Sequence, residues 1–402
     1  MKERKEILFV INTLGHAGAE TALVELLRRI DPEEYHVSLY VLMGQGEMLD
    51  SLPVYVTVLN HDFDKSSVLA KEGQKKLKKT VMKAMWRKAT WLKDFGYLVR
   101  HGVRMAVNRK IQPDKLLWRV LSDGAEFFDT KYDLAVAYLE GGATYYVADH
   151  VKADKKACFI HVDYNQAGYT RSLDRDCYLK YQKIFTVSEE VRKTFLRTYH
   201  ECDEVTEVFH NLLDVSGILE KAEDFKAFED DFDGKRIVTV GRLTMQKAFE
   251  VSIETMKLLK ERGKKVRWYV YGEGDQREKL ESLIKQYHLE QDFFLPGAVS
   301  NPYPYMKEAD LYVHASKFEG KSIAIQEAQI LGKPIVVSDC SGNREQVIQG
   351  VDGLLCDFSP EAICNGICEL LENEEMCARL GRAAALKNDD EHTDLHKLLE
   401  LL

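Results

Sequence analysis

Short apolar runs that alternate with amphipathic stretches constrain this chain more than any other feature. The runs are rich in Val, Ile, Leu and Tyr and lack strict polar alternation, as parallel strands buried on both faces do. The β-then-α rhythm predicts a doubly wound parallel sheet. In the first half of the chain, strands are expected at 7–13, 36–42, 54–59, 133–138, 157–161 and 184–187.

A polar stretch interrupts this rhythm, which then restarts. The stretch includes the acidic run 229–233, which either holds a metal or, as we expect, is the solvated face of a linker. Strands are expected again at 236–240, 266–271, 293–295, 311–314, 335–338 and 353–355. A length of 402 residues also fits two domains better than one.

The sequence therefore predicts the α/β class, with two Rossmann-like doubly wound domains in tandem. We expect an N-terminal domain over 1–215, a linker over 216–235, a C-terminal domain over 236–380 and a helical tail over 381–402. In open α/β sheets, ligands bind outside the carboxyl ends of the strands. Two such domains that face one another make a cleft, so the candidate residues are those that directly follow strands.

Charge is distributed unevenly along the chain. The net charge of −9 does not favour a nucleic-acid partner, yet the insertion 65–119 holds 16 Lys/Arg and only 3 Asp/Glu. Apolar residues from Val81 to Val99 recur there at roughly helical spacing. This pattern predicts a basic amphipathic helix, which either lies on an anionic membrane surface or packs on the core with its cationic face in solvent.

Targeting and redox features are few. The apolar run 7–14 is too short for a signal peptide or a membrane span and is expected to be a strand. The eight cysteines show no C-x-x-C spacing, and Cys364 and Cys368, one helical turn apart, fit a buried helix face better than a metal site. We expect a cytoplasmic protein, peripheral on the inner face of the plasma membrane if the basic insertion binds lipid.

The most specific motif is the segment 318–339, FEGKSIAIQEAQILGKPIVVSD. Glu319 and Glu327 are eight residues apart, a spacing that predicts two carboxylates on one face of a helix. At the start of a helix, free backbone amides bind phosphate or carboxylate oxygens. The residues expected to supply that helix start are Gly320, Lys321, Ser322 and Ile323. The alternative is a surface helix with two unrelated acids.

Two further loops follow expected strands of the C-terminal half. Arg242 and Lys247 come after the strand 236–240 and are expected to converge on a diphosphate, whose charge grows as a bond to it breaks. The alternative is an ordinary basic loop. Gly272 and Gly274 permit a tight turn close to a ligand, or form a plain βα turn.

The N-terminal half supplies a second set of candidates at strand ends. His161 ends the strand 157–161, and Asp163 either orients it or binds an acceptor. Glu140 follows the strand 133–138. The loop after the first strand contributes Gly15, His16 and Gly18 and opens a helix.

These motifs resemble those of the retaining glycosyltransferases of family 4, which have the GT-B fold. Residues 236–355 carry most of the resemblance, and 7–215 carry a weaker one. The resemblance implies that Glu319 approaches the donor sugar, that Glu327 approaches the ribose hydroxyls, and that the amides between them hold the sugar and diphosphate. It also places the nucleotide near Gly272, Gly274 and Gly297, and the donor sugar opposite His161.

One departure from the family pattern G-R-L-x-x-x-K-G concerns the cationic loop. Here Ala248 stands where the last glycine is usual, which adds a Cβ near the expected phosphates. Arg242 and Lys247 themselves match. The form E-G-K-S further resembles bacterial enzymes that build capsular and other surface polysaccharides.

The resemblance implies an enzyme that moves a hexosyl group from a nucleotide-diphosphate donor, with a UDP-sugar favoured, to a saccharide or polyprenyl-diphosphate-linked acceptor. We expect retention by front-face attack, no cofactor and no metal, since no D-x-D motif ends a strand. Two alternatives are a nucleotide-sugar epimerase of the same fold and a non-catalytic nucleotide-sugar-binding scaffold. The scaffold would not need Arg242, Lys247, Glu319 and Glu327 intact.

Overall fold

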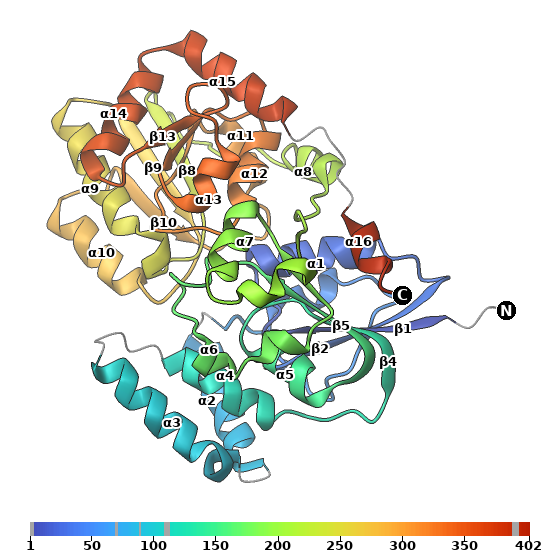
Figure 1. The fold of residues 1–402 in the computed structure, drawn as a ribbon. Helices are drawn as coiled ribbons and strands as arrows, with labels where there is room; N and C mark the ends of the chain where they lie inside the picture. Colours follow the sequence, from blue (N-terminus) through green and yellow to red (C-terminus); the bar gives the residue numbers. More distant parts are fainter. Residues whose placement is uncertain (1–3, 69–70, 88–89, 108–112, 388–393) are drawn as a thin grey trace. The chain divides into compact units, whose positions relative to one another are not determined.

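The chain folds into two compact units, each built on one parallel sheet (Figure 1). A computed structural model describes residues 4–68, 71–87, 90–107, 113–387 and 394–402. Of these, 4–212 and 394–402 form the first unit and 213–387 the second. The predicted α/β architecture of two doubly wound sheets is confirmed.

The first unit has a seven-stranded sheet of order β3-β2-β1-β4-β5-β6-β7. All its strand pairs are parallel, and the direction of the strand order reverses between β1 and β4. The strands are β1 Lys5–Ile11, β2 Tyr35–Val41, β3 Thr57–Val58, β4 Lys131–Ala137, β5 Lys152–Ile160, β6 Lys183–Thr186 and β7 Thr206–Val208.

The second unit has a six-stranded sheet of order β10-β9-β8-β11-β12-β13, which reverses between β8 and β11. Neighbouring residues of one strand enter different apolar clusters: Ile237 packs with α9, α10 and α14, and Val238 with α11 and α12. Burial on both faces explains the continuous apolar runs. The strands are β8 Lys235–Val240, β9 Val266–Tyr271, β10 Phe293–Gly297, β11 Leu311–His314, β12 Ile335–Ser338 and β13 Leu354–Cys356.

Helices connect these strands and cover the sheets. Those of the first unit are α1 Gly18–Arg28, α2 Lys71–Trp86, α3 Thr90–Val107, α4 Pro113–Asp123, α5 Gly142–His150, α6 Arg171–Asp174, α7 Glu189–Leu196 and α16 Leu395–Leu399. Those of the second are α8 Val215–Lys221, α9 Phe249–Glu261, α10 Arg277–Gln286, α11 Tyr303–Glu308, α12 Ile323–Ile330, α13 Ser341–Gln346, α14 Pro360–Leu371 and α15 Glu374–Leu386. Cys364 lies buried on α14, as expected for a helix face.

Several segment boundaries differ from the expected ones. The expected strand 54–59 shrinks to the two residues of β3, because Val54 is fully exposed, and the short edge strand β7 was not predicted. The expected linker 216–235 contains most of α8, which packs within the second unit.

The expected tail 381–402 is divided between the units. Its first part continues α15, residues 388–393 lie outside the described residues, and α16 belongs to the first unit. There Asp394 accepts a hydrogen bond of 2.7 Å from the amide of His210, and Lys397 donates one of 2.8 Å to the carbonyl of Val208. These bonds to the chain just after β7 hold the C-terminus on the first sheet.

The basic insertion 65–119 forms more than the one predicted helix: it contains α2, α3 and the start of α4, while 69–70, 88–89 and 108–112 lie outside the described residues. One face of α3 packs on the first unit, where buried Asp94 lies 3.1 Å from Arg175 and the Tyr97 hydroxyl donates to the Leu173 carbonyl at 3.2 Å. The other face is exposed and apolar. In the part of the chain that the structure describes, no helix is long and apolar enough to cross a bilayer.

Candidate active site

The second sheet places a compact charged cluster at the point where its strand order reverses. His314 is the last residue of β11, and Lys247 and Glu319 lie in the loops that follow β8 and β11. Lys247 Nζ is 2.6 Å from Glu319 Oε1 and 3.1 Å from His314 Nε2, and that nitrogen is 3.0 Å from the same carboxylate oxygen. Strands on either side of such a reversal leave room for a ligand between their loops.

Burial and the contacts among the three side chains together set the charge state of this cluster. Glu319 and His314 are almost fully buried, and Lys247 is largely buried. Burial raises the pKa of Glu319, but the charge of Lys247 and the hydrogen bond with His314 outweigh it and hold that pKa well below its usual range. Burial and the nearby Lys247 lower the pKa of His314, so its ring is neutral. The cluster is therefore an ammonium–carboxylate pair beside a neutral imidazole.

Hydrogen bonds tie the two loops of this cluster together. The Gln246 side chain donates to the Phe318 carbonyl at 2.9 Å, and the Lys317 amide donates to the Gln246 carbonyl at 2.9 Å. The Tyr312 hydroxyl lies 3.3 Å from His314 Nδ1. Each charged side chain thus has a fixed backbone position before any ligand arrives.

Arg242 differs from Lys247 in its surroundings. Its side chain is exposed, and among the described residues it has no carboxylate within ion-pair distance. Lys247, in contrast, is paired with Glu319, and its expected convergence with Arg242 on a diphosphate stays a prediction. Ala248, which follows, adopts φ 49° and ψ 43°, the left-handed conformation that glycine prefers. The loop therefore has the turn that a glycine would form, although its residue 248 is alanine.

The glycines after β9 allow this loop to pack against its neighbour. A Cβ on Gly272 would lie 2.0 Å from the Gly241 carbonyl oxygen, and one on Gly274 would lie 2.2 Å from that of Leu243. The β9 loop therefore supports the backbone on both sides of Arg242. Gly297 ends β10, where its carbonyl accepts a hydrogen bond of 2.9 Å from the Gly272 amide.

The two glutamates of the predicted pair do not share a helix face. Because α12 begins at Ile323, Glu319 lies in the loop before it, and only Glu327 is helical. Glu327 accepts a hydrogen bond of 2.9 Å from the Tyr303 hydroxyl. Burial raises the pKa of Glu327 to about 7, although the Tyr303 bond opposes the rise. One glutamate is thus fixed as an anion, and the other gains a proton near neutral pH.

The start of α12 is partly occupied by the protein itself. The Ser322 amide donates to Gln346 Oε1 at 2.7 Å, and Gln346 Nε2 donates to the Ser322 carbonyl at 2.8 Å. The Ser322 amide, which was expected to face a ligand, thus has a partner within the protein. Gly320 and Lys321 lie in the loop that leads into α12, and Ile323 is its first residue, where backbone amides point out of the helix.

The first sheet carries the other candidates at its own reversal, between β1 and β4. His161 directly follows β5, and its amide donates to Glu140 Oε2 at 3.0 Å. Asn12 joins the loops, since its side chain donates to the Glu140 carbonyl at 3.0 Å and accepts from the Ala143 amide at 2.7 Å. His161 and Glu140 are thus brought together as neighbours.

His161 has an unusual ring environment. Burial lowers its pKa to about 4, so the imidazole is neutral at physiological pH. The buried Nε2 has no hydrogen-bond partner among the described residues. A buried ring nitrogen without a partner is costly unless a ligand or water meets it.

The remaining candidates of the first unit shape loops. Asp163 accepts hydrogen bonds from the amides of Asn165 and Gln166 at 3.1 and 3.0 Å, so its carboxylate holds the loop that follows His161. In the loop after β1, Gly15 is buried, His16 is exposed, and Gly18 begins α1.

Sequence reasoning missed several residues that build these sites. His314, Tyr303, Gln346 and Asn12 carry the contacts described above. His314 and Asn12 had a signal, since each stands at the carboxyl end of a predicted strand. Gln346 and Tyr303 had none, because each reaches its partner from another helix. Among the described residues, no group of three or more His, Cys, Asp or Glu side chains is placed to hold a metal.

Comparison with known proteins agrees with this division. Residues 220–387 match the family described as "Glycosyl transferases group 1". A glycosyltransferase of Methanocaldococcus jannaschii is 28% identical over 55% of this chain and 61% of its own length. The Campylobacter jejuni N-acetylgalactosamine-N,N'-diacetylbacillosaminyl-diphospho-undecaprenol 4-alpha-N-acetylgalactosaminyltransferase is 33% identical over 42% of this chain and 45% of its own. The chain thus spans less than two thirds of the length of each of these curated relatives.

Solved structures match over the whole chain. Anabaena Alr3699/HepE, crystallised with UDP-glucose, superposes with a TM-score of 0.70 over 99% of this chain and 100% of its own, at 17% identity. Identity this low supports the fold only. In this chain, the strand order reverses near the centre of each of the two parallel sheets. The chain has the GT-B fold, and its residues 220–387 match the group 1 glycosyltransferases.

Proposed function

We propose that the protein transfers a sugar from a nucleotide-diphosphate donor to a saccharide or lipid-linked acceptor in the synthesis of a surface polysaccharide. The observation that carries the proposal is the Lys247–Glu319 pair, beside the exposed Arg242, at the strand reversal of the domain that matches the group 1 family. Departure of a nucleoside diphosphate creates negative charge, and fixed cations in a site of low dielectric stabilise it.

Different residues of the site have different roles in stabilising the leaving diphosphate. The exposed Arg242 contacts the phosphates, while Glu319 positions Lys247 by accepting its hydrogen bond. The first amides of α12, from Ile323, add a partial positive charge, and Glu327 binds the ribose hydroxyls. We propose transfer with retention by front-face attack, as in family 4: the acceptor hydroxyl enters beside the leaving phosphate, which takes its proton. No metal is required for this arrangement of cations.

The neutral His161 serves the acceptor side. Its orphaned Nε2 fits a hydroxyl group of a sugar better than a phosphate, because a neutral ring offers no charge. Glu140, Gly15, His16, Gly18 and Asp163 shape the surrounding loops.

The nature of the substrates follows by similarity. The Anabaena structure holds UDP-glucose, which supports a UDP-sugar as donor, and the name of the Campylobacter enzyme includes a diphospho-undecaprenol, which supports a lipid-linked acceptor. The decisive measurement incubates purified protein with UDP-, GDP- and dTDP-sugars and a lipid-diphosphate-linked sugar, and determines the anomeric configuration of the product by NMR. Sugar transfer with retention is expected. Donor epimerisation without an acceptor would contradict the proposal, as would donor binding without turnover.

An anionic membrane surface is the proposed second partner, through α3. Its outward face exposes apolar side chains spaced three or four residues apart, and Arg100 and Arg104 directly follow two of them. Basic residues beside an apolar stripe favour an interface with anionic lipid. The exposed apolar side chains of α3 are Leu92, Phe95, Val99, Val103 and Val107.

Co-sedimentation with vesicles tests this surface. Vesicles of phosphatidylglycerol and phosphatidylcholine are expected to bind the protein, and phosphatidylcholine alone to bind it much less. Leu92→Ser with Phe95→Ser should reduce binding several-fold, because two exposed apolar side chains of the stripe are lost. The matched control, Leu179→Ser with Leu219→Ser, removes two comparably exposed side chains elsewhere. Equal binding by both double variants would contradict the assignment to α3.

A further inference from the structure

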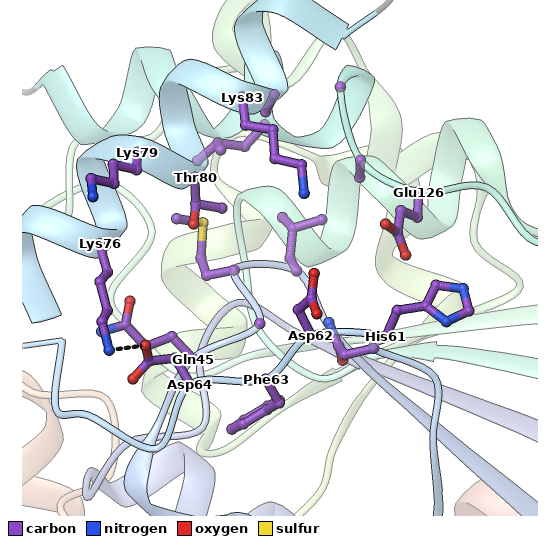
Figure 2. Close-up of a pocket in the computed structure, with 18 of the residues that line it drawn as sticks. Gln45, His61, Asp62, Phe63, Asp64, Lys76, Lys79, Thr80, Lys83 and Glu126 are labelled. Atoms are coloured by element: carbon purple, nitrogen blue, oxygen red, sulfur yellow. Dashed lines mark ion pairs between the residues drawn. The ribbon is translucent and has the colours of Figure 1, made fainter.

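A cavity opens on the first unit, and neither His161 nor Glu140 lines it. It has a volume of about 390 Å³, within the usual range for small-ligand sites. Its floor is the chain that follows β2 and β3, at 42–45 and 60–64, and its roof is α2 (Figure 2). The carboxyl ends of parallel strands are where open α/β sheets bind ligands.

The roof of this cavity carries a row of cations along α2 and just beyond its end. The row, spaced three or four residues apart, is Lys76, Lys79 and Lys83 on α2 and Arg87 directly after it. The two outer members are paired: Lys76 with Asp64, and Arg87 with Glu126, the latter at 3.2 Å. Among the described residues, neither Lys79 nor Lys83 has a carboxylate within ion-pair distance. The middle of the row therefore offers two ammonium groups to an anion.

The opposite wall has the reverse polarity. Asp62 lies across from Lys83, with His61 next to it (Figure 2). An ionised carboxylate only accepts hydrogen bonds, so it recognises hydroxyl donors and repels phosphate. A ligand that fits both walls must carry an anionic group on one side and hydroxyls on the other. A sugar bearing a phosphate has both.

The cavity is formed before any ligand binds. The buried Gln45 side chain donates to the Gly73 carbonyl at 3.2 Å and to that of Ser66 at 3.2 Å, which fixes the start of α2 on the β2 loop. At the other end of α2, Gly124 approaches so closely that a Cβ would lie 2.3 Å from the Ala84 carbonyl oxygen. Because both ends of α2 are held in place, a ligand can bind without the free-energy cost of rearranging the cavity.

The floor of the cavity also connects with the candidate acceptor side. The Met43 amide donates to the Asn12 carbonyl at 3.0 Å, and the Leu14 amide donates to the Gln45 carbonyl at 2.9 Å. The loop that carries Gly15 and His16 is thus hydrogen-bonded to the cavity floor through its neighbours Asn12 and Leu14.

We propose that this cavity binds a glycosyl phosphate, with the phosphate on Lys79 and Lys83 and the sugar hydroxyls on Asp62. The ligand is either a lipid-linked sugar or a free sugar phosphate, which share this chemistry. Its identification as the acceptor of the reaction rests on the proposed function; the binding site does not.

Residue-resolved lysine acetylation tests the site without any need for turnover. Glucose 1-phosphate is the probe, and mass spectrometry reads the modification of each lysine. Lys79 and Lys83 are expected to be protected by the probe, while Lys75 and Lys78, exposed on the same helix outside the cavity, stay reactive. Glucose alone should protect neither. Equal modification with and without the probe would overturn the proposal.

Calorimetry with matched variants measures the affinity. Lys79→Gln with Lys83→Gln should weaken glucose 1-phosphate binding about tenfold or more, because two charge-assisted hydrogen bonds are lost. Lys75→Gln with Lys78→Gln removes the same charge from the same helix and should leave binding unchanged. If both double variants bound glucose 1-phosphate equally weakly, the loss would reflect the overall charge of the helix, and the proposed site would be wrong.

Two further measurements distinguish a lipid-linked ligand from a free sugar phosphate, and the proposed cavity site from the proposed function. Citronellyl phosphate esterified to glucose should bind more tightly than glucose 1-phosphate if the natural ligand is lipid-linked, and equally if it is a free sugar phosphate; binding of neither would contradict the site. UDP binding should be the same in the Lys79→Gln/Lys83→Gln variant and the native protein. Protected lysines in a protein that never transfers sugar would support the cavity and contradict the proposed function alone.

Discussion

The two sheets have the same strand order at their centres, yet they hold opposite chemistry where that order reverses. Between β8 and β11, the second unit buries an ammonium–carboxylate pair. Between β1 and β4, the first unit offers the amide Asn12, and the neighbouring β5 supplies the neutral His161. Topology thus fixes where each site lies, and the few residues after the strands decide what it can bind.

The difference fits the two halves of the proposed transfer reaction. A leaving diphosphate needs fixed positive charge, whereas an incoming sugar hydroxyl needs a hydrogen-bond partner without charge. Glu319 is kept ionised by the adjacent Lys247 and His314, and His161 is kept neutral because its ring is buried. Variants that exchange or remove these charges therefore test the comparison directly.

The largest effect is expected from Lys247→Ala. It removes the proposed leaving-group cation, so turnover should fall by about 100- to 1,000-fold or more. It also leaves the Glu319 carboxylate buried without its partner, which should lower the free energy of unfolding by about 3–5 kcal/mol. Steady-state kinetics and urea denaturation measure the two losses.

A double variant separates these two losses. Lys247→Met with Glu319→Gln removes both charges together, so most of the stability should return while turnover stays low. Recovery of turnover in the double variant would contradict a role for Lys247 in charge stabilisation. Continued instability would contradict the view that the unpaired carboxylate is the cause.

Arg242→Ala is expected to have a similar kinetic effect without the structural one. Its side chain is exposed and has no ion pair among the described residues, so stability should change by less than about 0.5 kcal/mol. Turnover should still fall by about 100-fold, because the phosphate contact is lost. Arg197→Ala, an exposed arginine of the first unit, serves as the control. Normal turnover of Arg242→Ala would remove it from the site.

The sequence alone predicted what depends on local pattern. The strands of both sheets are buried on both faces, so their apolar runs stand out, and residues such as Lys247 and His161 lie in the loops that follow them. The edge strands of the first sheet are the exception: β3 has only two residues, and the three-residue β7 was not predicted.

Pairings between distant loops were beyond sequence reasoning. Lys247 meets Glu319 because β8 and β11 are neighbours in the sheet, a fact of strand order rather than of spacing. The bond between Ser322 and Gln346 likewise depends on where α13 packs. The eight-residue spacing suggested a shared helix face for the glutamates, but Glu319 precedes the start of α12.

The two sites should respond to pH with opposite signs. His161 has a folded pKa of about 4 against an ordinary 6.5, so it contributes stability above pH 6.5 that is lost as pH falls towards 4. Glu327 has a folded pKa of about 7 against an ordinary 4.5, so its contribution is full below pH 4.5 and is lost as pH rises towards 7. Each amounts to about 3 kcal/mol.

Difference curves isolate the two contributions. The free energy of unfolding is measured from pH 4 to 8 for the native protein, for His161→Gln and for Glu327→Gln. Native minus His161→Gln should rise with pH up to 6.5, and native minus Glu327→Gln should fall from pH 4.5 to 7. Two flat curves, or two of the same sign, would show that the ring and the carboxyl group are not buried as described.

The smallest effect concerns the first βα loop of each unit. After β8, Ala248 holds a left-handed φ of 49°, whereas Ala17 before α1 is extended at φ −146°. Ala248→Gly should relieve about 1–2 kcal/mol of backbone strain, offset by the entropy of the new glycine and by the loss of a buried methyl group. We expect a net change within about 1 kcal/mol and nearly unchanged turnover. Ala248→Val, which cannot adopt this conformation easily, should destabilise the second unit clearly in calorimetry. If glycine were the more disruptive of the two substitutions, the loop would not have the glycine-like turn that holds Lys247 against Glu319.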